Sequence, residues 1–206
     1  MAMSPIPPSE NTANKTAIWN VTATIHESLP PYTLMFMGYV DPDGREHIET
    51  IAVSGRQEGQ IQQQIQQLLV DIDAWSYDFL EGGYVIEDLN FDGYADLRLQ
   101  EFLPASPNIP YLYWLYNPER QQFEANAALR EITSPEVLPE QQTIRGFARL
   151  SAASYIWSDY QWRAGELMLV REEQATYDTE GNRRVVVSER QGDEMVVVSD
   201  RFEAVE

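Results

Sequence analysis

Most of the chain alternates apolar and polar residues with a period of two, which is the pattern of a β-strand buried on one face. It starts at residues 18–26, where Trp19, Val21 and Ala23 are separated by polar residues. The same pattern, or an unbroken run of β-branched and aromatic residues, predicts further strands over 33–40, 45–53, 84–87, 96–102, 111–116, 122–124, 143–151, 154–162, 166–177, 183–190 and 195–202.

Short turn sequences separate these predicted strands. Asp41-Pro42-Asp43-Gly44 joins the second and third strands as a hairpin, and 163–165, 179–182 and 191–193 do the same near the C-terminal end. The sequence shows no alternation of strand and helix patterns that would indicate βαβ units. The chain is therefore predicted to be all-β and antiparallel with little helix, in a propeller, a barrel or a sandwich.

One segment breaks the strand pattern. In 60–70, Ile61, Ile65, Leu68 and Leu69 are spaced as on one face of a helix, and glutamines, which are good helix formers, lie between them. This spacing predicts a short amphipathic helix.

The first 16 residues form a separate region. They are rich in proline and polar residues and lack apolar periodicity, which predicts a flexible tether, with Met1-Ala2-Met3 typical of a start introduced for expression. Such a tether suits a lipoprotein stalk, whose lipid anchor would lie upstream of Met1, although a frayed terminus is the simpler interpretation. Residues 17–206 are predicted to be one all-β domain.

The most specific chemistry lies in the acidic stretch 88–97. Side-chain oxygens at positions one, three and five, a glycine at six and a carboxylate at nine follow the start of the EF-hand ligand series. Calcium takes six to eight oxygens at about 2.3–2.6 Å and tolerates irregular geometry. The predicted calcium ligands are Asp88, Asn90, Asp92, the main-chain carbonyl of Tyr94, and Asp96.

An EF-hand would carry glutamate at position twelve, where this chain has Leu99. Because strand-like sequence flanks the stretch, we expect strand, calcium loop, strand. Gly93 would supply a backbone conformation that a Cβ resists. The alternative is a solvated acidic turn, since Asn-x-Asp-Gly is also ordinary turn chemistry. With no other polar cluster nearby, the ion would be structural.

The net charge of −19 argues against binding to nucleic acid or anionic membranes and favours basic protein partners. The chain has no cysteine, which excludes disulfides and thiol catalysis. No apolar run approaches the ~18 residues of a membrane span, so no transmembrane segment is predicted.

No catalytic constellation can be recognised. No serine sits in a nucleophile elbow, and no glycine loop is built to hold phosphate. His26 and His47 could face one another across a sheet, but a zinc site would need further ligands. We therefore expect no enzyme and no catalytic residues. A glycosidase remains the open alternative, since it requires only two suitably spaced carboxylates among 33 acids.

The aromatic residues of 111–116 admit two interpretations. Aromatic side chains are usually buried in cores, which favours packing. Exposed, they would form a sugar-stacking platform, and the chain would then be a calcium-dependent carbohydrate or cell-wall binding module.

Three segments together resemble the XAC2610-related bacterial proteins. They are the stretch 88–97, Tyr113-Trp114-Leu115-Tyr116-Asn117-Pro118 with Phe123, and Tyr160-Gln161-Trp162 followed by Gly165-Glu166-Leu167. That family includes periplasmic lipoproteins that act as immunity proteins against lysozyme-like effectors of bacterial-killing secretion systems. The similarity is good over residues 84–172 and loose before them.

The resemblance implies an antiparallel β-propeller-like fold, calcium in the 88–97 loop, and inhibition by insertion of a loop into the effector's substrate cleft. Our leading hypothesis is therefore a calcium-binding periplasmic immunity protein that inhibits a peptidoglycan hydrolase, a protein partner. The region before Gly83 matches poorly, so the sequence assigns no partner-binding residues.

Overall fold

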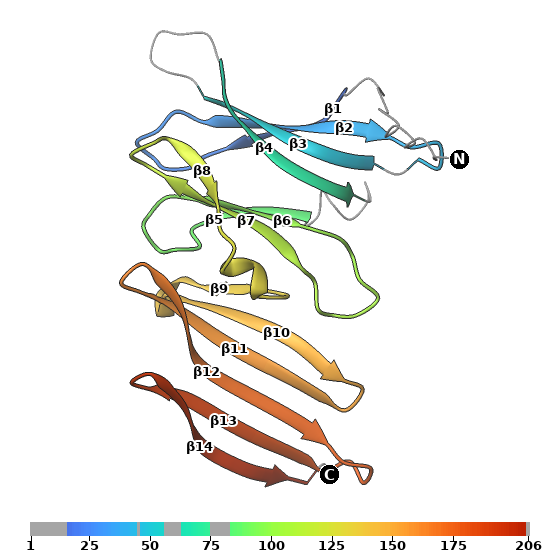
Figure 1. The fold of residues 1–206 in the computed structure, drawn as a ribbon, viewed down its shortest axis with the longest axis vertical. Helices are drawn as coiled ribbons and strands as arrows, with labels where there is room; N and C mark the ends of the chain where they lie inside the picture. The colour runs from blue at the N-terminus through green and yellow to red at the C-terminus, as the bar shows by residue number, and fades with distance from the viewer. Residues whose placement is uncertain (1–15, 45, 56–62, 75–82, 205–206) are drawn as a thin grey trace, which may run out of the picture.

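The structure is a computed structural model that describes residues 16–44, 46–55, 63–74 and 83–204. The predicted tether lies almost wholly outside these residues, apart from Thr16, which begins the first strand. The described strands form three antiparallel sheets that follow one another along the chain. In Figure 1 the sheets are stacked along the long axis, with the N-terminal sheet at the top and the C-terminal sheet at the bottom.

The first sheet contains four strands in sequence order. They are β1 (Thr16–Ala23), β2 (Tyr32–Val40), β3 (Glu46–Gly55) and β4 (Gln63–Ala74). Burial alternates strictly along most of β2, as the period-two pattern predicts.

The short helix predicted over 60–70 is wrong for residues 63–70, which belong to β4. Leu68 pairs with Ile51 of β3 and is buried, whereas the neighbouring Leu69 is 80% exposed. The long-range pairing with β3 overrides the local helix preference of the glutamines.

The middle sheet also has four strands in sequence order. They are β5 (Tyr84–Glu87), β6 (Asp96–Gln100), β7 (Tyr111–Asn117) and β8 (Gln122–Ala125). Both faces of this sheet are covered, so the first four residues of β6 are buried in succession. Leu97 and Leu99 pack toward the first sheet, while Tyr111 and Tyr113 belong to a second core on the other side.

The third sheet has six strands in the order β14-β13-β12-β11-β10-β9. Two short 3-10 helices, η2 (Leu129–Glu131) and η3 (Pro139–Gln141), lie before and after its first strand. The strands are β9 (Glu136–Leu138), β10 (Thr143–Ser151), β11 (Ser154–Arg163), β12 (Glu166–Tyr177), β13 (Arg183–Gln191) and β14 (Glu194–Glu203).

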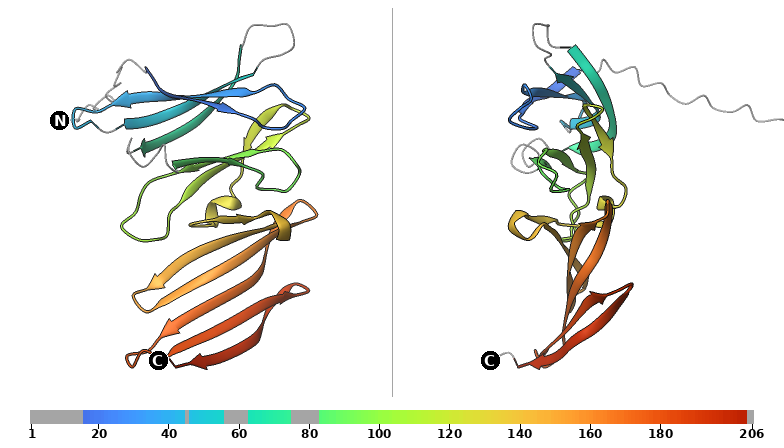
Figure 2. Two further views of the ribbon diagram at one scale, coloured as in Figure 1. Left: turned by 180° about the vertical axis from the view of Figure 1, so that it is seen from behind. Right: turned by 90° about the vertical axis from the view of Figure 1, so that its left-hand side faces the viewer.

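The edge-on view in Figure 2 shows the six-stranded sheet as a single layer. Only a small cluster of Ala175, Val185 and Val187 is buried on its outer strands. The all-β, antiparallel prediction is thus confirmed, while the described strands form open sheets and no closed propeller is found among them. Nor does any helix in this part of the chain have the length and apolar character to cross a bilayer.

Candidate metal centre

The acidic loop, residues 88–97, leaves β5 and runs into β6, so it forms the long connection of a β-hairpin. Two leucines fix its ends, because Leu89 is buried in the core beside the six-stranded sheet and Leu97 in the core beside the first sheet. Gly93 has φ +91°, and a Cβ there would meet no neighbouring atom, so its backbone conformation is what favours glycine. Phe91 also has a positive φ of 60°, which the sequence did not predict.

The polar side chains at positions one, three and five fold over the loop's own backbone. The Asp88 carboxylate accepts the N–H groups of Asp92 (3.2 Å) and Gly93 (2.9 Å). Asn90 Oδ1 accepts the Asp92 N–H at 3.2 Å, and Asp92 Oδ1 accepts the Tyr94 N–H at 2.8 Å. The loop therefore holds three oxygen-bearing side chains in one turn, as the spacing predicts.

Asp96 has a different position from the other acids. Its carboxylate is fully buried, and it accepts the main-chain N–H groups of Leu89 (2.8 Å) and Tyr116 (2.7 Å). Burial raises the pKa of Asp96 to about 7, and the charges of Asp92 and Asp88 add to that, while the two N–H donors oppose it. Through these two hydrogen bonds, Asp96 attaches the loop at Leu89 to β7 at Tyr116.

The donor set fits a hard cation. Two carboxylates, one amide oxygen and the Tyr94 carbonyl are all oxygen donors of the kind that calcium takes. In the described part of the chain no three His, Cys, Asp or Glu side chains form a metal-binding group, so amide and main-chain oxygens would have to complete the ligand set here. Position nine of such loops often reaches the ion through a water, which is compatible with this placement.

The acidic loop contacts both neighbouring sheets. The Ala95 N–H donates to the Ile25 carbonyl at 2.7 Å, and the Tyr94 ring stacks on His26 at 4.6 Å, next to the first sheet. On the opposite side, Trp162 Nε1 of β11 donates to the Leu89 carbonyl at 2.9 Å. The loop is therefore the junction of all three sheets.

These contacts involve residues that the sequence left without a role at this site. Ile25, His26 and Trp162 carry no local signal, since their partners lie more than 60 positions away along the chain. The two histidines do not form the pair considered from the sequence: His26 follows β1 and stacks on Tyr94, and His47 of β3 stacks on Tyr39.

The aromatic run of β7 belongs to the interior. Tyr111, Tyr113, Trp114 and Tyr116 are all buried, and the Tyr116 hydroxyl is bonded to that of Tyr32 at 2.8 Å. The core-packing interpretation is confirmed, because a buried ring cannot stack on a sugar. The platform proposed for residues 111–116 is therefore wrong.

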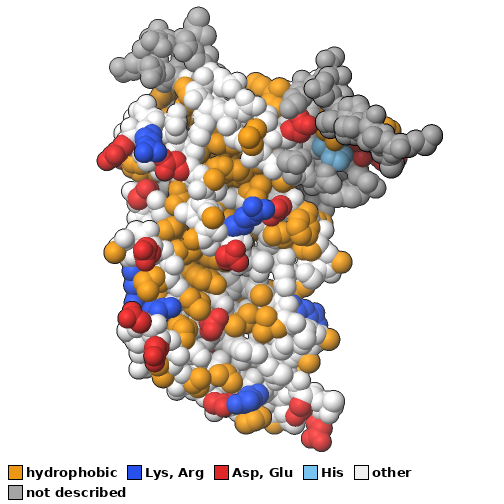
Figure 3. Space-filling model, viewed as in Figure 1, with side chains coloured by type: hydrophobic (Ala, Val, Ile, Leu, Met, Phe, Trp, Pro, Cys, Tyr) orange, Lys and Arg blue, Asp and Glu red, His pale blue; other side chains and the backbone are white. Residues whose placement is uncertain are grey.

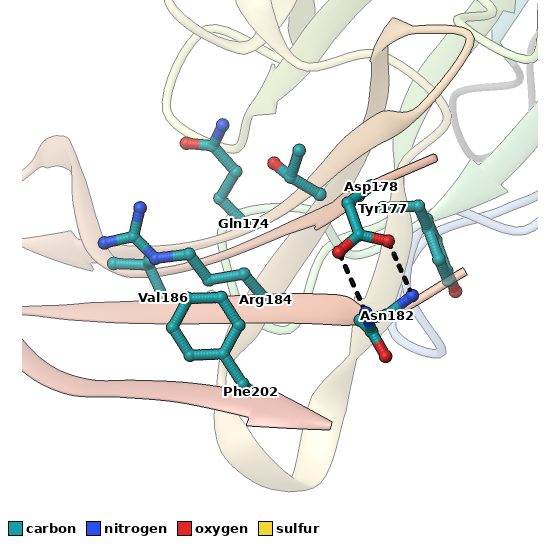
Figure 4. A pocket seen from close by; sticks show the side chains of 8 residues that line it. Gln174, Tyr177, Asp178, Asn182, Arg184, Val186 and Phe202 are labelled. Carbon is teal, nitrogen blue, oxygen red and sulfur yellow. Dashed lines mark hydrogen bonds between the residues drawn. The ribbon is translucent and has the colours of Figure 1, made fainter. Parts of the chain in front are cut away.

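Several arginines on the surface are paired with acids, although acids outnumber basic residues in the chain. Figure 3 shows acidic and basic side chains next to one another in several places over the face drawn, among apolar ones. On the outer strands Arg184 forms two bonds to Asp200, at 2.8 and 2.6 Å. Figure 4 shows Arg184 beside Phe202 in a hollow of ≈ 390 Å³, and Asp178 bonded to Asn182 at its rim.

The protein is therefore an all-β protein of three antiparallel sheets that meet at an acidic loop. A comparison with solved structures agrees with this fold. The chain is similar to a solved structure described as a Xanthomonas type IV secretion system related protein, with a TM-score of 0.59. The two are 16% identical, and the match covers 87% of this chain and 98% of that one. No family model and no curated protein sequence matches the chain.

Proposed function

We propose that the protein is a calcium-stabilised inhibitor of a peptidoglycan hydrolase, of the immunity type, acting in the periplasm. The observation that carries this proposal is the likeness in fold, over nearly the whole of both chains, to a protein related to a type IV secretion system. It agrees with the resemblance of the 88–97, 113–123 and 160–167 segments to the XAC2610-related proteins. A propeller-like arrangement of the sheets and a lipid anchor belong to the same proposal.

Calcium would be held by Asp88, Asn90, Asp92 and the Tyr94 carbonyl, with Asp96 as the buried brace. When bound, the ion supplies positive charge beside two carboxylates that the loop holds close together. These residues would then keep the Leu89 and Tyr94 contacts in place, and through them the alignment of the three sheets. Its role in the proposal is structural.

Charge supports the choice of partner. Enzymes that act on an anionic cell wall gain from a basic surface, and a chain of net charge −19 would attract such a surface over a distance. Steering of this kind raises association rates by roughly 10- to 1,000-fold and weakens with salt. Loops at the ends of strands are the elements suited to enter a cleft.

The test is inhibition of a muramidase encoded beside this gene or, where none is encoded there, of a purified lysozyme. Equimolar protein is expected to abolish its muramidase activity, and binding should weaken as salt is raised from 50 to 500 mM. The double variant Asp88→Asn with Asp92→Asn should inhibit less than the wild type in calcium-containing buffer and have a lower melting temperature there. Full hydrolase activity at a tenfold excess of the folded wild-type protein would refute the proposal.

A further inference from the structure

One face of the six-stranded sheet carries a group of aromatic and charged residues that the proposed function does not use. Cross-strand pairing puts Arg145 opposite Asp159, and Asp159 opposite Arg171. Two residues further along each strand, Phe147 lies opposite Trp157, and Trp157 lies opposite Glu173. Residues directly opposite one another project from the same face of a sheet, so these side chains form one surface.

The charged side chains of this surface hold one another in position. Arg145 makes two bonds to Asp159, at 2.7 and 3.0 Å, and Arg171 donates to Glu173 at 2.6 Å. These four residues carry two positive and two negative charges, with Glu136 of β9 beside them. Because acids already pair with the arginines, the surface has no excess positive charge with which to select an anion. It offers fixed donors and acceptors side by side.

The aromatic side chains form a half-buried row next to these pairs. The Phe147 ring lies 4.7 Å from Trp157 and 5.9 Å from Tyr155, centroid to centroid. Trp157 forms part of the wall of an open hollow of ≈ 530 Å³, together with Glu136, Arg145, Arg171 and Glu173. That volume is within the roughly 300–1,000 Å³ of ligand sites.

A second, smaller hollow of ≈ 290 Å³ lies on the other side of Phe147. Its walls are mostly apolar and include Pro107, Ala153 and Tyr155. The two hollows are spread along β10 between Arg145 and Arg149, a distance of about 14 Å at the rise of an antiparallel strand. The surface therefore has two adjacent hollows along β10. One is polar with an aromatic wall, and the other is apolar.

We propose that this face of the six-stranded sheet binds a neutral oligosaccharide that carries N-acetyl groups. A pyranose ring presents C–H groups on its face and hydroxyls on its edge, which match Trp157 and the paired Arg and acidic side chains. The apolar hollow suits an acetyl methyl group. A peptide strand is a poorer fit, because the main-chain groups of β10, β11 and β12 already pair with neighbouring strands and offer nothing across the face.

The test is calorimetric titration of the full chain with the β-1,4-linked tetramer of N-acetylglucosamine. Saturable binding is expected, and Trp157→Ala should raise the Kd by about tenfold or more. Trp157→Phe should restore part of the affinity, since it keeps an aromatic ring. Glu173→Gln preserves the side chain's size and should also weaken binding. It provides a second test that does not depend on whether Trp157→Ala folds.

The matched control is Phe202→Ala. Phe202 is 75% exposed and lies on the opposite face of the same sheet, beside Arg184, so its removal should leave the Kd unchanged. The glucose tetramer, which lacks N-acetyl groups, should bind more weakly. Absence of binding to the wild type at millimolar sugar, equal affinity in Trp157→Ala and the wild type, or tighter binding of a sulfated glycan would each overturn the proposal. None of these outcomes depends on hydrolase inhibition, which is measured separately.

Discussion

The middle sheet and the outer strands of the six-stranded sheet are made of similar strands but are stabilised in different ways. The middle sheet is buried on both faces, and Leu89, Leu97 and Leu99 have no exposed surface. On β12–β14 only Ala175, Val185 and Val187 are buried, while Val197 and Phe202 are mostly exposed. Hydrophobic burial supports the first region, whereas the second depends mainly on strand pairing, since its exposed ion pairs contribute little.

This difference divides the protein into a scaffold and an open surface. The scaffold contains the acidic loop and its contacts to both neighbouring sheets, so a change there should affect the whole fold. The outer strands β12–β14 leave most of their surface accessible, so a change there should affect binding more than stability.

Leu89→Ala is expected to lower the free energy of unfolding by roughly 2–5 kcal/mol, because a fully buried leucine would leave a cavity in the core. Val187→Ala, in the small outer cluster, should cost clearly less, since it removes fewer methyl groups from a site with few neighbours. Chemical denaturation measures both. Equal losses for the two variants would mean that the outer strands are as tightly packed as the scaffold.

Calcium is expected to stabilise the wild type by about 2.7 kcal/mol at a hundredfold excess over its Kd, because the ion would bind only the folded loop. Thermal melting with calcium and with chelator measures the shift. Amide exchange should slow in β6 and stay unchanged in β14, which has no contact with the acidic loop among the described hydrogen bonds.

Asp88→Asn with Asp92→Asn should abolish the calcium shift. Asp178→Asn is the matched control, because Asp178 also accepts N–H groups within an acidic turn but lies in the connection between β12 and β13. A calcium shift that survives the double substitution would place the ion elsewhere and would remove the metal site from the proposed function.

The six-stranded sheet was also the part of the fold easiest to predict. The strands from β10 to β14 start and end within about one residue of their predicted limits, because alternation and the turns at Gly165, Gly181 and Gly192 are local signals. The acidic loop was placed correctly between two strands for the same reason. The roles of Ile25, His26 and Trp162 at that loop depend on contacts between distant segments, which no local pattern contains.

Residues 63–70 show the opposite case, in which a local signal was misleading. Gln66 acts there as a bridge between sheets: its side chain accepts the Phe123 N–H at 2.8 Å and donates to the Phe123 carbonyl at 2.6 Å. A glutamine that mimics a neighbouring strand in this way cannot be told from a helix-forming one by spacing alone.

Gln66→Leu is therefore expected to cost about 2 kcal/mol, because both main-chain groups of Phe123 would lose their partner. Gln67→Leu is the control. The neighbouring Gln67 has an exposed side chain on the other face of β4, so this change should have little effect. Urea denaturation compares them. If the two variants are equally stable, the bridge between the first and middle sheets contributes nothing.

Trp162→Phe is the mildest of these changes and the most direct test of the division. It keeps an aromatic ring in the core but removes the hydrogen bond to the Leu89 carbonyl, which should cost about 1 kcal/mol. The reason to measure it is cooperativity: this bond is the polar link between the acidic loop and the six-stranded sheet. Amide exchange in β11 and β12 should become faster than in β6, because the sheet can then open without the loop. Uniform acceleration in all three sheets would show that they unfold as one unit, and the scaffold would then extend to the C-terminal strands.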